Sequence, residues 1–166
     1  MPLGPQHDRE AFSCGTPALD QYLRRQARQD QDRNISVCWV LPDANQPSRI
    51  RGYYTLSSYA VRLVELTDEV KRRLPRYEHM PAAMLGRLAV DSNHTRQGLG
   101  EHLLLDAMQK VLMTSETVGT LVLVVDAKDQ QAAAFYQHFD FIPFPSQPLR
   151  LFLPLATIER ALAQDP

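Results

Sequence analysis

The sequence predicts an α/β fold built on a mixed sheet, and three segments that follow one another along the chain carry this prediction. Residues 84–91 have the apolar character of a strand and lead into a glycine-containing turn. Residues 98–114 then place apolar side chains on one helix face, with a period of about 3.6 residues. Residues 121–125 form a continuous apolar run, which is typical of a buried strand. This alternation of strand, helix and strand indicates an α/β chain.

Local signals place the remaining elements in order. A helix is expected at residues 17–29, with Thr16 as its N-cap and Pro17 at its first position. The other expected helices are 68–74, 98–114, 130–138 and 154–162. The expected strands are 35–41, 49–63 as one long strand or a bent pair, 84–91, 120–126 and 149–153. The proline-containing stretches 42–47 and 143–148 predict a loop and a turn-rich connection.

Length, charge and cysteine content describe an ordinary globular chain. Its 166 residues suit one domain with its own core, and its net charge is −1. No apolar run approaches the length that spans a bilayer, and the first five residues lack the apolar stretch of a signal peptide. We therefore expect a cytoplasmic protein with no membrane contact. Cys14 and Cys38 have neither metal nor redox spacing, so we expect free thiols and no metal site.

The run Arg96-Gln97-Gly98-Leu99-Gly100 lies between the strand that ends near Asp91 and the helix that follows. The first N–H groups of a helix have no partner within it and carry a partial positive charge. Glycines beside them let the backbone approach a phosphate closely. The run therefore predicts a turn that holds the phosphate of a nucleotide-like cofactor. A glycine pair placed there for turn geometry alone is the alternative.

Three segments resemble the core of GCN5-related N-acetyltransferases (GNAT), namely Leu88-Ala89-Val90-Asp91, the glycine turn and Ala134-Phe135-Tyr136-Gln137-His138-Phe139. The resemblance covers about residues 10–154 and implies a single GNAT domain over residues 1–166. It implies a mixed, mostly antiparallel sheet flanked by helices. It also implies splayed central strands, because those at Leu88 and Leu123 would part at one end to admit the arm of the cofactor. Residues 12–27 and 73–77 further resemble the acetyltransferase toxins of bacterial toxin–antitoxin pairs.

The resemblance implies that acetyl-CoA is the cofactor and that the strand and the turn hold it. The strand at residues 88–90 would pair with the pantetheine arm, and the turn would hold the pyrophosphate. Thr95 stands where the family usually has glutamine or arginine, and Arg96 is then the neighbouring positive charge. The residues expected to bind acetyl-CoA are Leu88, Ala89, Val90, Thr95, Arg96, Gln97, Gly98, Leu99, Gly100 and Glu101.

Catalysis is expected to depend on Tyr136. In acetyl transfer an amine attacks a thioester carbonyl, and the thiolate that leaves needs a proton. The resemblance implies that Tyr136 donates this proton as general acid. We expect the aromatic pair Phe135 and Tyr136 to be exposed on its helix, and core packing of Tyr136 is the alternative. Glu65, Glu78 and His79 are candidates for a general base by residue type only.

The lack of an evident base favours an acceptor amine that is already partly neutral at physiological pH. An α-amine has a pKa of about 7.7–8.0, against about 10.4 for lysine. Arginines cluster in the first helix and before the strand at residue 88, which predicts binding to a phosphate chain. A solvated helix face, balanced by Asp20, Asp30 and Asp32, is the alternative. The residues expected to bind this phosphate chain, which the toxin resemblance implies to be that of a tRNA, are Arg24, Arg25, Arg28, Arg72, Arg73, Arg76 and Arg87.

Together with the toxin resemblance, these features predict an acetyl-CoA-dependent N-acetyltransferase that acetylates the α-amine of aminoacyl-tRNA and blocks translation. The resemblance implies a ribbon-helix-helix antitoxin as partner and a homodimer. Two alternatives stay open. One is a GNAT enzyme that acts on a small-molecule amine or a protein N-terminus, and the other is a non-catalytic binding module such as a co-repressor. Turnover of acetyl-CoA separates the enzymes from the module, and growth arrest on expression separates the toxin from the other enzymes.

Overall fold

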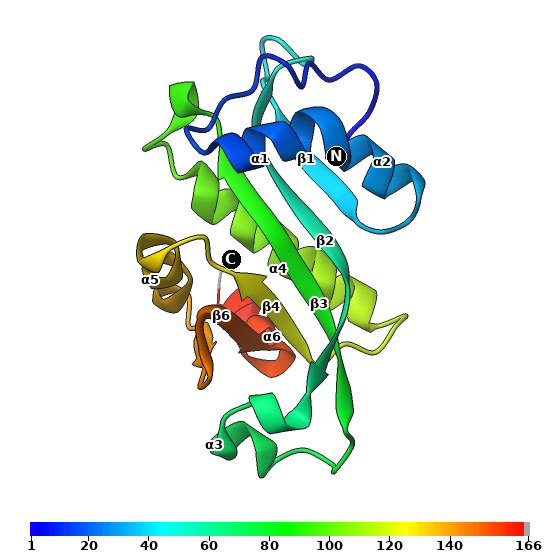
Figure 1. The fold of residues 1–166 in the computed structure, drawn as a ribbon, viewed down its shortest axis with the longest axis vertical. Helices are drawn as coiled ribbons and strands as arrows, with labels where there is room; N and C mark the ends of the chain where they lie inside the picture. Colours follow the sequence, from blue (N-terminus) through cyan, green and yellow to red (C-terminus); the bar gives the residue numbers. More distant parts are fainter. Residues whose placement is uncertain (165–166) are drawn as a thin grey trace. The chain divides into compact units, whose positions relative to one another are not determined.

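The computed structural model describes residues 1–164, which form six strands in one mixed sheet with helices beside it (Figure 1). The strand order is β1-β2-β3-β4-β6-β5. The pairs β1/β2, β4/β6 and β5/β6 are antiparallel. The predicted α/β class with a mixed sheet is therefore confirmed.

The chain divides into two compact units. Unit 1 comprises residues 1–57 and 85–107, and unit 2 comprises residues 58–84 and the described residues from 108 onward. Three elements run through both units: β2 (Ile50–Arg62), β3 (His79–Val90) and α4 (Leu99–Ser115). The expectation of one domain over residues 1–166 stays a prediction. No helix within residues 1–164 is long and apolar enough to cross a membrane.

In unit 1 the front helix has three parts. They are α1 (Pro17–Gln21), a π-helical turn η1 (Tyr22–Gln26) and α2 (Ala27–Asp32). The predicted start is confirmed, but the helix continues past residue 29. The Asp30 carboxylate holds this part together because it accepts hydrogen bonds from Tyr22 Oη at 3.0 Å and Gln26 Nε2 at 2.9 Å. Thr16 is at the N-cap, yet its side chain makes no capping bond.

Strand β1 (Val37–Pro42) follows the front helix and pairs with β2 from Val37 opposite Leu56 to Leu41 opposite Gly52. The register shifts at Pro42, which lies opposite Ile50. Residues 1–3 lie along the other side of β1. The N–H of Leu3 donates to the Cys38 carbonyl at 2.8 Å, and the N–H of Val40 donates to the Met1 carbonyl at 2.8 Å.

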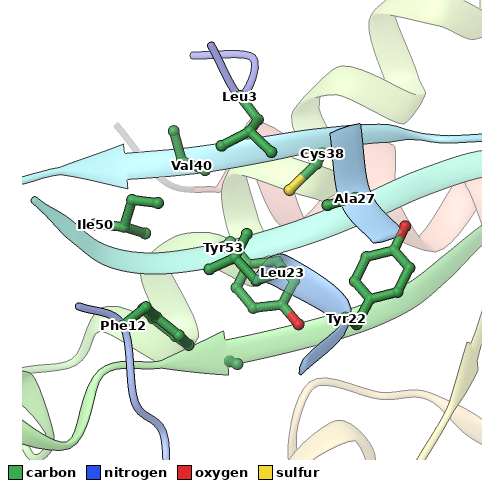
Figure 2. Packing of buried hydrophobic residues seen from close by; sticks show 10 residues of the cluster. Leu3, Phe12, Tyr22, Leu23, Ala27, Cys38, Val40, Ile50 and Tyr53 are labelled. Atoms are coloured by element: carbon green, nitrogen blue, oxygen red, sulfur yellow. The ribbon is translucent and has the colours of Figure 1, made fainter. Parts of the chain in front are cut away.

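The core of unit 1 joins these pieces (Figure 2). Figure 2 shows Tyr53 of β2 among side chains from the N-terminal segment and the front helix. Phe12 packs edge-on against Tyr53 with ring centroids 5.5 Å apart, and Tyr53 Oη donates to the Leu19 carbonyl at 2.7 Å. The cluster consists of Leu3, Phe12, Tyr22, Leu23, Ala27, Cys38, Val40, Ile50, Tyr53 and Ala89. Because Ala89 belongs to it, the core fixes the end of β3 that leads into the glycine turn.

Unit 2 contains the second half of the chain and the segment between β2 and β3. Its further elements are η2 (Leu63–Glu65), α3 (Asp68–Lys71), β4 (Val122–Asp126), α5 (Gln130–His138), β5 (Ile142–Phe144), β6 (Gln147–Pro154) and α6 (Leu155–Ala163). Strand β4 pairs with β6 from Val122 opposite Pro154 to Asp126 opposite Arg150. Its buried cluster is Val61, Leu66, Ala82, Val122, Val124, Phe144 and Phe152.

Several sequence-based boundaries, including the following three, differ from the structure. The stretch 143–148, predicted as a turn-rich connection, contains β5 and the start of β6, with Ile142 opposite Phe152 and a register shift at Phe144. Strand β3 begins at His79 rather than at residue 84, and the carbonyl of Pro81 accepts from the N–H of Leu121 at 2.9 Å. Helix α3 ends at Lys71 rather than at residue 74. In the first case the prolines suggested a turn, although proline is compatible with strand edges and strand starts.

Candidate active site

The glycine turn has the backbone geometry that a phosphate-binding turn needs. Strand β3 ends at Val90, the one-turn helix η3 (Ser92–His94) follows, and α4 begins at Leu99. Arg96 has a φ of +61° and Gly98 a φ of +73°. An added Cβ at Gly98 would meet no atom within 4 Å, so glycine is favoured there by the positive φ and not by a lack of space. Residues 95–98 are exposed, which leaves the main chain before α4 open to a ligand.

Asp91 anchors this turn, a role that sequence reasoning did not assign to it. Its carboxylate is buried, with 1% of the residue exposed. One oxygen accepts from the N–H of Ser13 at 3.2 Å, and the other accepts from the N–H of Asn93 at 2.9 Å. The N–H of Ser92 in turn donates to the Ser13 carbonyl at 2.8 Å. An aspartate that begins a turn is a recognisable signal for the local bond, whereas the bond to Ser13 depends on the fold.

His94 connects the turn to the loop after β1. Its Nε2 lies 3.5 Å from a carboxylate oxygen of Asp43, and its Nδ1 lies 3.6 Å from one of Asp91. Asp43 also accepts from the N–H groups of Asn45 and Gln46, and these bonds help to hold the pKa of its carboxyl below the usual value. The loop 43–49 and the turn are therefore joined through one imidazole.

The end of β3 presents two faces. Ala89 is buried in the core of unit 1, while Leu88 and Val90 are half-buried and alternate with it along the strand. Gly52 of β2 permits a close approach here, because a Cβ on it would lie 2.7 Å from Leu103 Cδ1 and 3.1 Å from the Ala89 carbonyl oxygen. The structure thus brings the ten expected cofactor residues into one continuous segment of β3, turn and first turn of α4. Their contacts with acetyl-CoA stay a prediction.

Thr95 and Arg96 differ in how available they are to a ligand. The Thr95 hydroxyl donates to the Ser92 carbonyl at 3.4 Å, so it has an internal partner. Arg96 is exposed and its left-handed φ turns the chain just before Gly98. The side-chain charge nearest to the turn is therefore that of Arg96.

Tyr136 is buried on α5, contrary to the expectation of an exposed aromatic pair. Only 6% of it is exposed, and Phe135 is half-buried. Its ring packs edge-on against those of Phe135 and Phe141, with centroids 5.2 and 5.4 Å away. The helix that carries it is capped by Asp129, whose carboxylate accepts from the N–H of Ala132 at 2.8 Å. Helical spacing could have indicated this burial. Tyr136 falls three residues after Ala133, so the two lie on the same face of α5, and both are buried.

Burial has a chemical consequence for Tyr136. It raises the pKa of the phenol above its usual value, because the charged phenolate would lose its hydration. The hydroxyl therefore holds its proton throughout the physiological pH range. A group that keeps a proton until negative charge develops on a neighbour is suited to donate it.

The arginines of the front helix divide into two kinds. Arg24 Nη2 donates to the Phe12 carbonyl at 2.6 Å, and Arg28 Nη1 donates to the Leu3 carbonyl at 3.2 Å. Arg28 also lies 3.5 Å from the Asp32 carboxylate. Both therefore hold the N-terminal segment against the helix. Of Arg24, Arg25 and Arg28, only Arg25 is exposed.

The second arginine cluster lies on unit 2 around a hollow of about 850 Å³. Arg72 and Arg76 line it, as do Arg62 and Tyr77, which sequence reasoning did not assign. Arg73 does not line the hollow and lies 4.0 Å from Glu69. The full lining is Arg62, Leu63, Val64, Asp68, Lys71, Arg72, Leu74, Arg76, Tyr77 and Glu78. RNA binding by the predicted arginines stays a prediction.

Within residues 1–164 no group of three or more His, Cys, Asp or Glu side chains is arranged to hold a metal ion. Cys14 is half-exposed and Cys38 is buried, and neither of them forms a disulfide.

A strand that runs into an exposed glycine turn at a helix start, on a mixed sheet with flanking helices, is the arrangement expected of an acetyltransferase-type α/β domain. A family model described as "Acetyltransferase (GNAT) domain" matches residues 34–143, and the chain belongs to this family. The protein is thus a GNAT acetyltransferase, as the sequence motifs predicted.

Two relatives match nearly the whole chain. The "tRNA-acetylating toxin" of Mycobacterium tuberculosis is 37% identical over 158 residues, which cover 95% of this chain and 92% of that protein. The "Probable toxin TacT" of Sinorhizobium fredii is 29% identical over 165 residues, covering 95% and 91%.

Solved structures show the same likeness. AtaT complexed with acetyl-methionyl-tRNAfMet has a TM-score of 0.90 and 29% identity, with 98% of this chain and 97% of that chain covered. A tyrosine-to-phenylalanine variant of KacT has a TM-score of 0.88 and 32% identity, covering 94% and 92%. AtaTR bound with AcCoA has a TM-score of 0.84 and 30% identity, covering 97% and 95%.

Proposed function

We propose that this protein transfers the acetyl group of acetyl-CoA to the α-amine of aminoacyl-tRNA and so blocks translation as the toxin of a toxin–antitoxin pair. The exposed turn at Arg96–Gly98, with both residues at positive φ before α4, carries the acetyl-CoA part of the proposal. The acceptor is supported by the relative named as a tRNA-acetylating toxin, which is 37% identical over 95% of this chain. A charged-tRNA substrate also fits a cytoplasmic protein.

In this proposal the cofactor is held mainly by the backbone. The N–H groups of residues 95–101 bind the pyrophosphate, favoured by the positive end of α4. The main chain of Leu88, Ala89 and Val90 pairs with the pantetheine arm. A backbone N–H of this strand donates to the thioester oxygen when negative charge develops on it. The anchoring of the turn by Asp91, and of β3 by the core around Ala89, supports a rigid site.

Tyr136 is proposed to complete the chemistry. The acceptor nitrogen attacks the thioester carbonyl carbon, the C–N bond forms, and the amine proton passes to solvent. The tetrahedral intermediate then breaks its C–S bond, Tyr136 Oη donates its proton to the CoA thiolate, and the phenolate regains a proton from solvent. Burial raises the pKa of this phenol, so its proton is present at physiological pH and can be donated when the thiolate forms. Two of the solved neighbours, KacT and AtaT, were crystallised as tyrosine-to-phenylalanine variants.

The arginines are proposed to bind the phosphate chain of the tRNA. Arg25, Arg72, Arg73 and Arg76 are exposed and therefore available for phosphate contacts. Arg24, Arg28 and Arg87 already contact other parts of unit 1, so we assign them a smaller share of RNA affinity. An α-amine acceptor needs no strong base. This agrees with our assigning no role to Glu65, Glu78 and His79, the candidates for a general base.

We further propose that the protein is held inactive by a ribbon-helix-helix antitoxin and forms a homodimer. Neighbouring structures support an antitoxin partner: one shows AtaT bound to the C-terminus of the antitoxin AtaR and acetyl-CoA, and another is a KacTA–DNA complex. Light scattering of the protein alone and of the co-expressed pair tests both assignments.

The decisive experiment incubates the purified protein with acetyl-CoA and a charged total tRNA pool. Nuclease digestion followed by mass spectrometry is expected to reveal acetylated aminoacyl-adenosine, and uncharged tRNA is expected to stay unmodified. If a polyamine or a peptide amine is acetylated efficiently while no tRNA product forms, the protein is a GNAT enzyme with another acceptor.

A further inference from the structure

The hollow on unit 2 has features that acetyl-CoA binding does not use. Its volume of about 850 Å³ lies within the roughly 300–1,000 Å³ range of ligand sites. Its walls come from the end of β2, from η2 and α3, and from residues 74–78. The N–H of Leu63 donates to the Glu78 carbonyl at 3.0 Å and so ties one wall to the other. Leu63 and Leu74 also pack against the buried cluster of unit 2, which anchors both walls.

Tyr77 is exposed although it is a large aromatic residue. The exposed fraction is 65%, and Tyr77 is absent from the buried cluster against which Leu63 and Leu74 pack. Its N–H donates to the Pro75 carbonyl at 3.0 Å, so a tight turn holds its backbone in place. A ring presented on a fixed turn at the edge of a hollow can stack on a flat partner. The bases of unpaired nucleotides are such partners, and aromatic side chains commonly receive them.

The charges around the ring favour an anionic chain. Arg62, Arg72 and Arg76 are exposed, and none of them is within 4.0 Å of a carboxylate of residues 1–164. Lys71 is paired with Asp68 at 3.1 Å, which leaves Glu78 as the second carboxylate of the lining. Four cations thus face two carboxylates, and the three free arginines have the guanidinium geometry that binds phosphate.

We propose that this hollow binds an unpaired nucleotide of the tRNA, with its base stacked on Tyr77 and its flanking phosphates held by Arg62, Arg72 and Arg76. The identity of the RNA rests on the proposed function. A free phosphate would use the arginines but not the exposed ring. The combination of ring and arginines instead matches single-stranded RNA, which offers both a π-face and a charged backbone.

The test measures binding of an uncharged tRNA acceptor-stem RNA that ends in an unpaired CCA, with 2-aminopurine as the terminal base. Tyr77→Leu is expected to weaken binding by roughly 5- to 150-fold, the range for loss of one base stack. Tyr77→Phe retains the π-face and is expected to bind within about twofold of the parent protein. The change in 2-aminopurine fluorescence on binding is expected in the parent and in Tyr77→Phe and to be lost in Tyr77→Leu.

The arginines provide a second and independent readout. Arg72→Gln and Arg76→Gln are each expected to lower the slope of log affinity against log salt by about 0.7. Arg160→Gln is the matched control, because Arg160 is exposed on α6 and lies outside the hollow. Its slope is expected to equal that of the parent. Calorimetric titration with acetyl-CoA confirms that every variant is folded.

The possible outcomes separate the two proposals. If charged tRNA is acetylated but Tyr77→Leu binds the RNA as well as the parent does, the hollow is not a nucleotide site and the proposed function stands. If only a small amine is acetylated while the Tyr77 and arginine effects on RNA are present, the hollow binds RNA and the proposed acceptor is wrong. If Tyr77→Leu loses affinity for an acidic antitoxin peptide and keeps that for RNA, the hollow is a peptide site and the inference is overturned.

Discussion

The guanidinium carbon of Arg87 lies 3.5 Å from the ring centroid of Tyr22, so a strand residue expected to bind RNA stacks on the π-helical turn of the front helix. Tyr22 Oη continues the contact to Asp30 Oδ2 at 3.0 Å and lies 3.2 Å from Ser36 Oγ. The chain of contacts connects β3 to the front helix and to the segment that enters β1. Arg87 therefore contributes to the stability of unit 1 whether or not RNA is bound.

We expect a measurable coupling between these two residues. Arg87→Gln and Tyr22→Leu should each lower the free energy of unfolding. The double variant should lose less than the sum by about 0.5–2 kcal/mol, the range for a cation–π pair. Urea denaturation of the four proteins gives this number. A coupling of zero would mean that the stacking contributes nothing to stability.

The turn can be tested with a pair of substitutions at Gly98. Asparagine and aspartate both tolerate the positive φ observed there, so their cost to folding is similar. Only aspartate adds a negative charge where the pyrophosphate is proposed to bind. A repulsion of about 1–4 kcal/mol at 4 Å predicts that Gly98→Asp binds acetyl-CoA at least about fivefold more weakly than Gly98→Asn. Equal affinities in calorimetric titration would remove the turn from the cofactor site.

Tyr136→Phe retains the ring that packs against Phe135 and Phe141 and removes only the hydroxyl. We expect acetyl-CoA affinity to stay within a few-fold and turnover to fall by about 10²–10⁴, the usual range for loss of a general acid. Steady-state kinetics with a fixed aminoacyl-tRNA measure the fall. A loss of less than about threefold would identify Tyr136 as a packing residue.

The two cysteines should differ in reactivity and in their effect on alkaline stability. Burial raises the pKa of Cys38 from 9.0 to about 12, whereas Cys14 is half-exposed. We expect a thiol reagent at pH 8 to modify Cys14 more than about tenfold faster than Cys38, as measured by labelling of the parent and of Cys14→Ser.

The raised pKa of Cys38 also predicts how the free energy of unfolding changes with pH. Below about pH 9 the Cys38 thiol is protonated in both the folded and the unfolded chain. Between about pH 9 and 12 it ionises only when unfolded, so the free energy of unfolding should fall as the pH rises. Urea titrations in this window test the slope, and Cys38→Ala should reduce it.

The front-helix arginines should separate RNA affinity from stability. Arg25→Glu is expected to weaken tRNA binding and lower its salt slope by about 0.7–0.9, with unchanged stability. Arg24→Gln loses a bond of 2.6 Å from a charged group to the Phe12 carbonyl and should cost about 1.5–3 kcal/mol of stability. Thermal melts and salt-dependent binding distinguish the two effects. Equal losses of tRNA affinity and of stability in the two variants would contradict this separation of roles between Arg25 and Arg24.

Elements with strong local signals were predictable from the sequence. Helix α5 has the predicted bounds, and α4 and α6 are displaced by one residue, because their apolar period and their starting residues are local. The π-helical turn Tyr22–Gln26 was not predictable, since its extra residue follows from contacts around Asp30 rather than from periodicity. Strand β5 was missed because Pro143 reads as a turn until its pairing with Leu151 is known.

The candidate site shows the same division between local and distant information. The glycine turn and Tyr136 could be proposed from the sequence because their motifs are contiguous, and their roles stay predictions. The bond from the Ser13 N–H to Asp91 joins residues 78 positions apart, and the contact of His94 with Asp43 depends on the same folding of the chain. The exposure of Tyr77, and the engagement of Arg24 and Arg28 by carbonyls, are likewise properties of packing that residue type does not reveal.

The hydrogen bonds of Leu3 and Val40 along β1 restrict how two copies of this chain can meet. An unpaired strand at the border of a sheet is a template on which another molecule can add a strand. Here the main-chain groups of Cys38 and Val40 are already taken by residues 1–3 of the same molecule. A dimer therefore cannot extend the sheet at these positions without first displacing residues 1–3. The same occupied border protects the protein against strand-to-strand aggregation at β1.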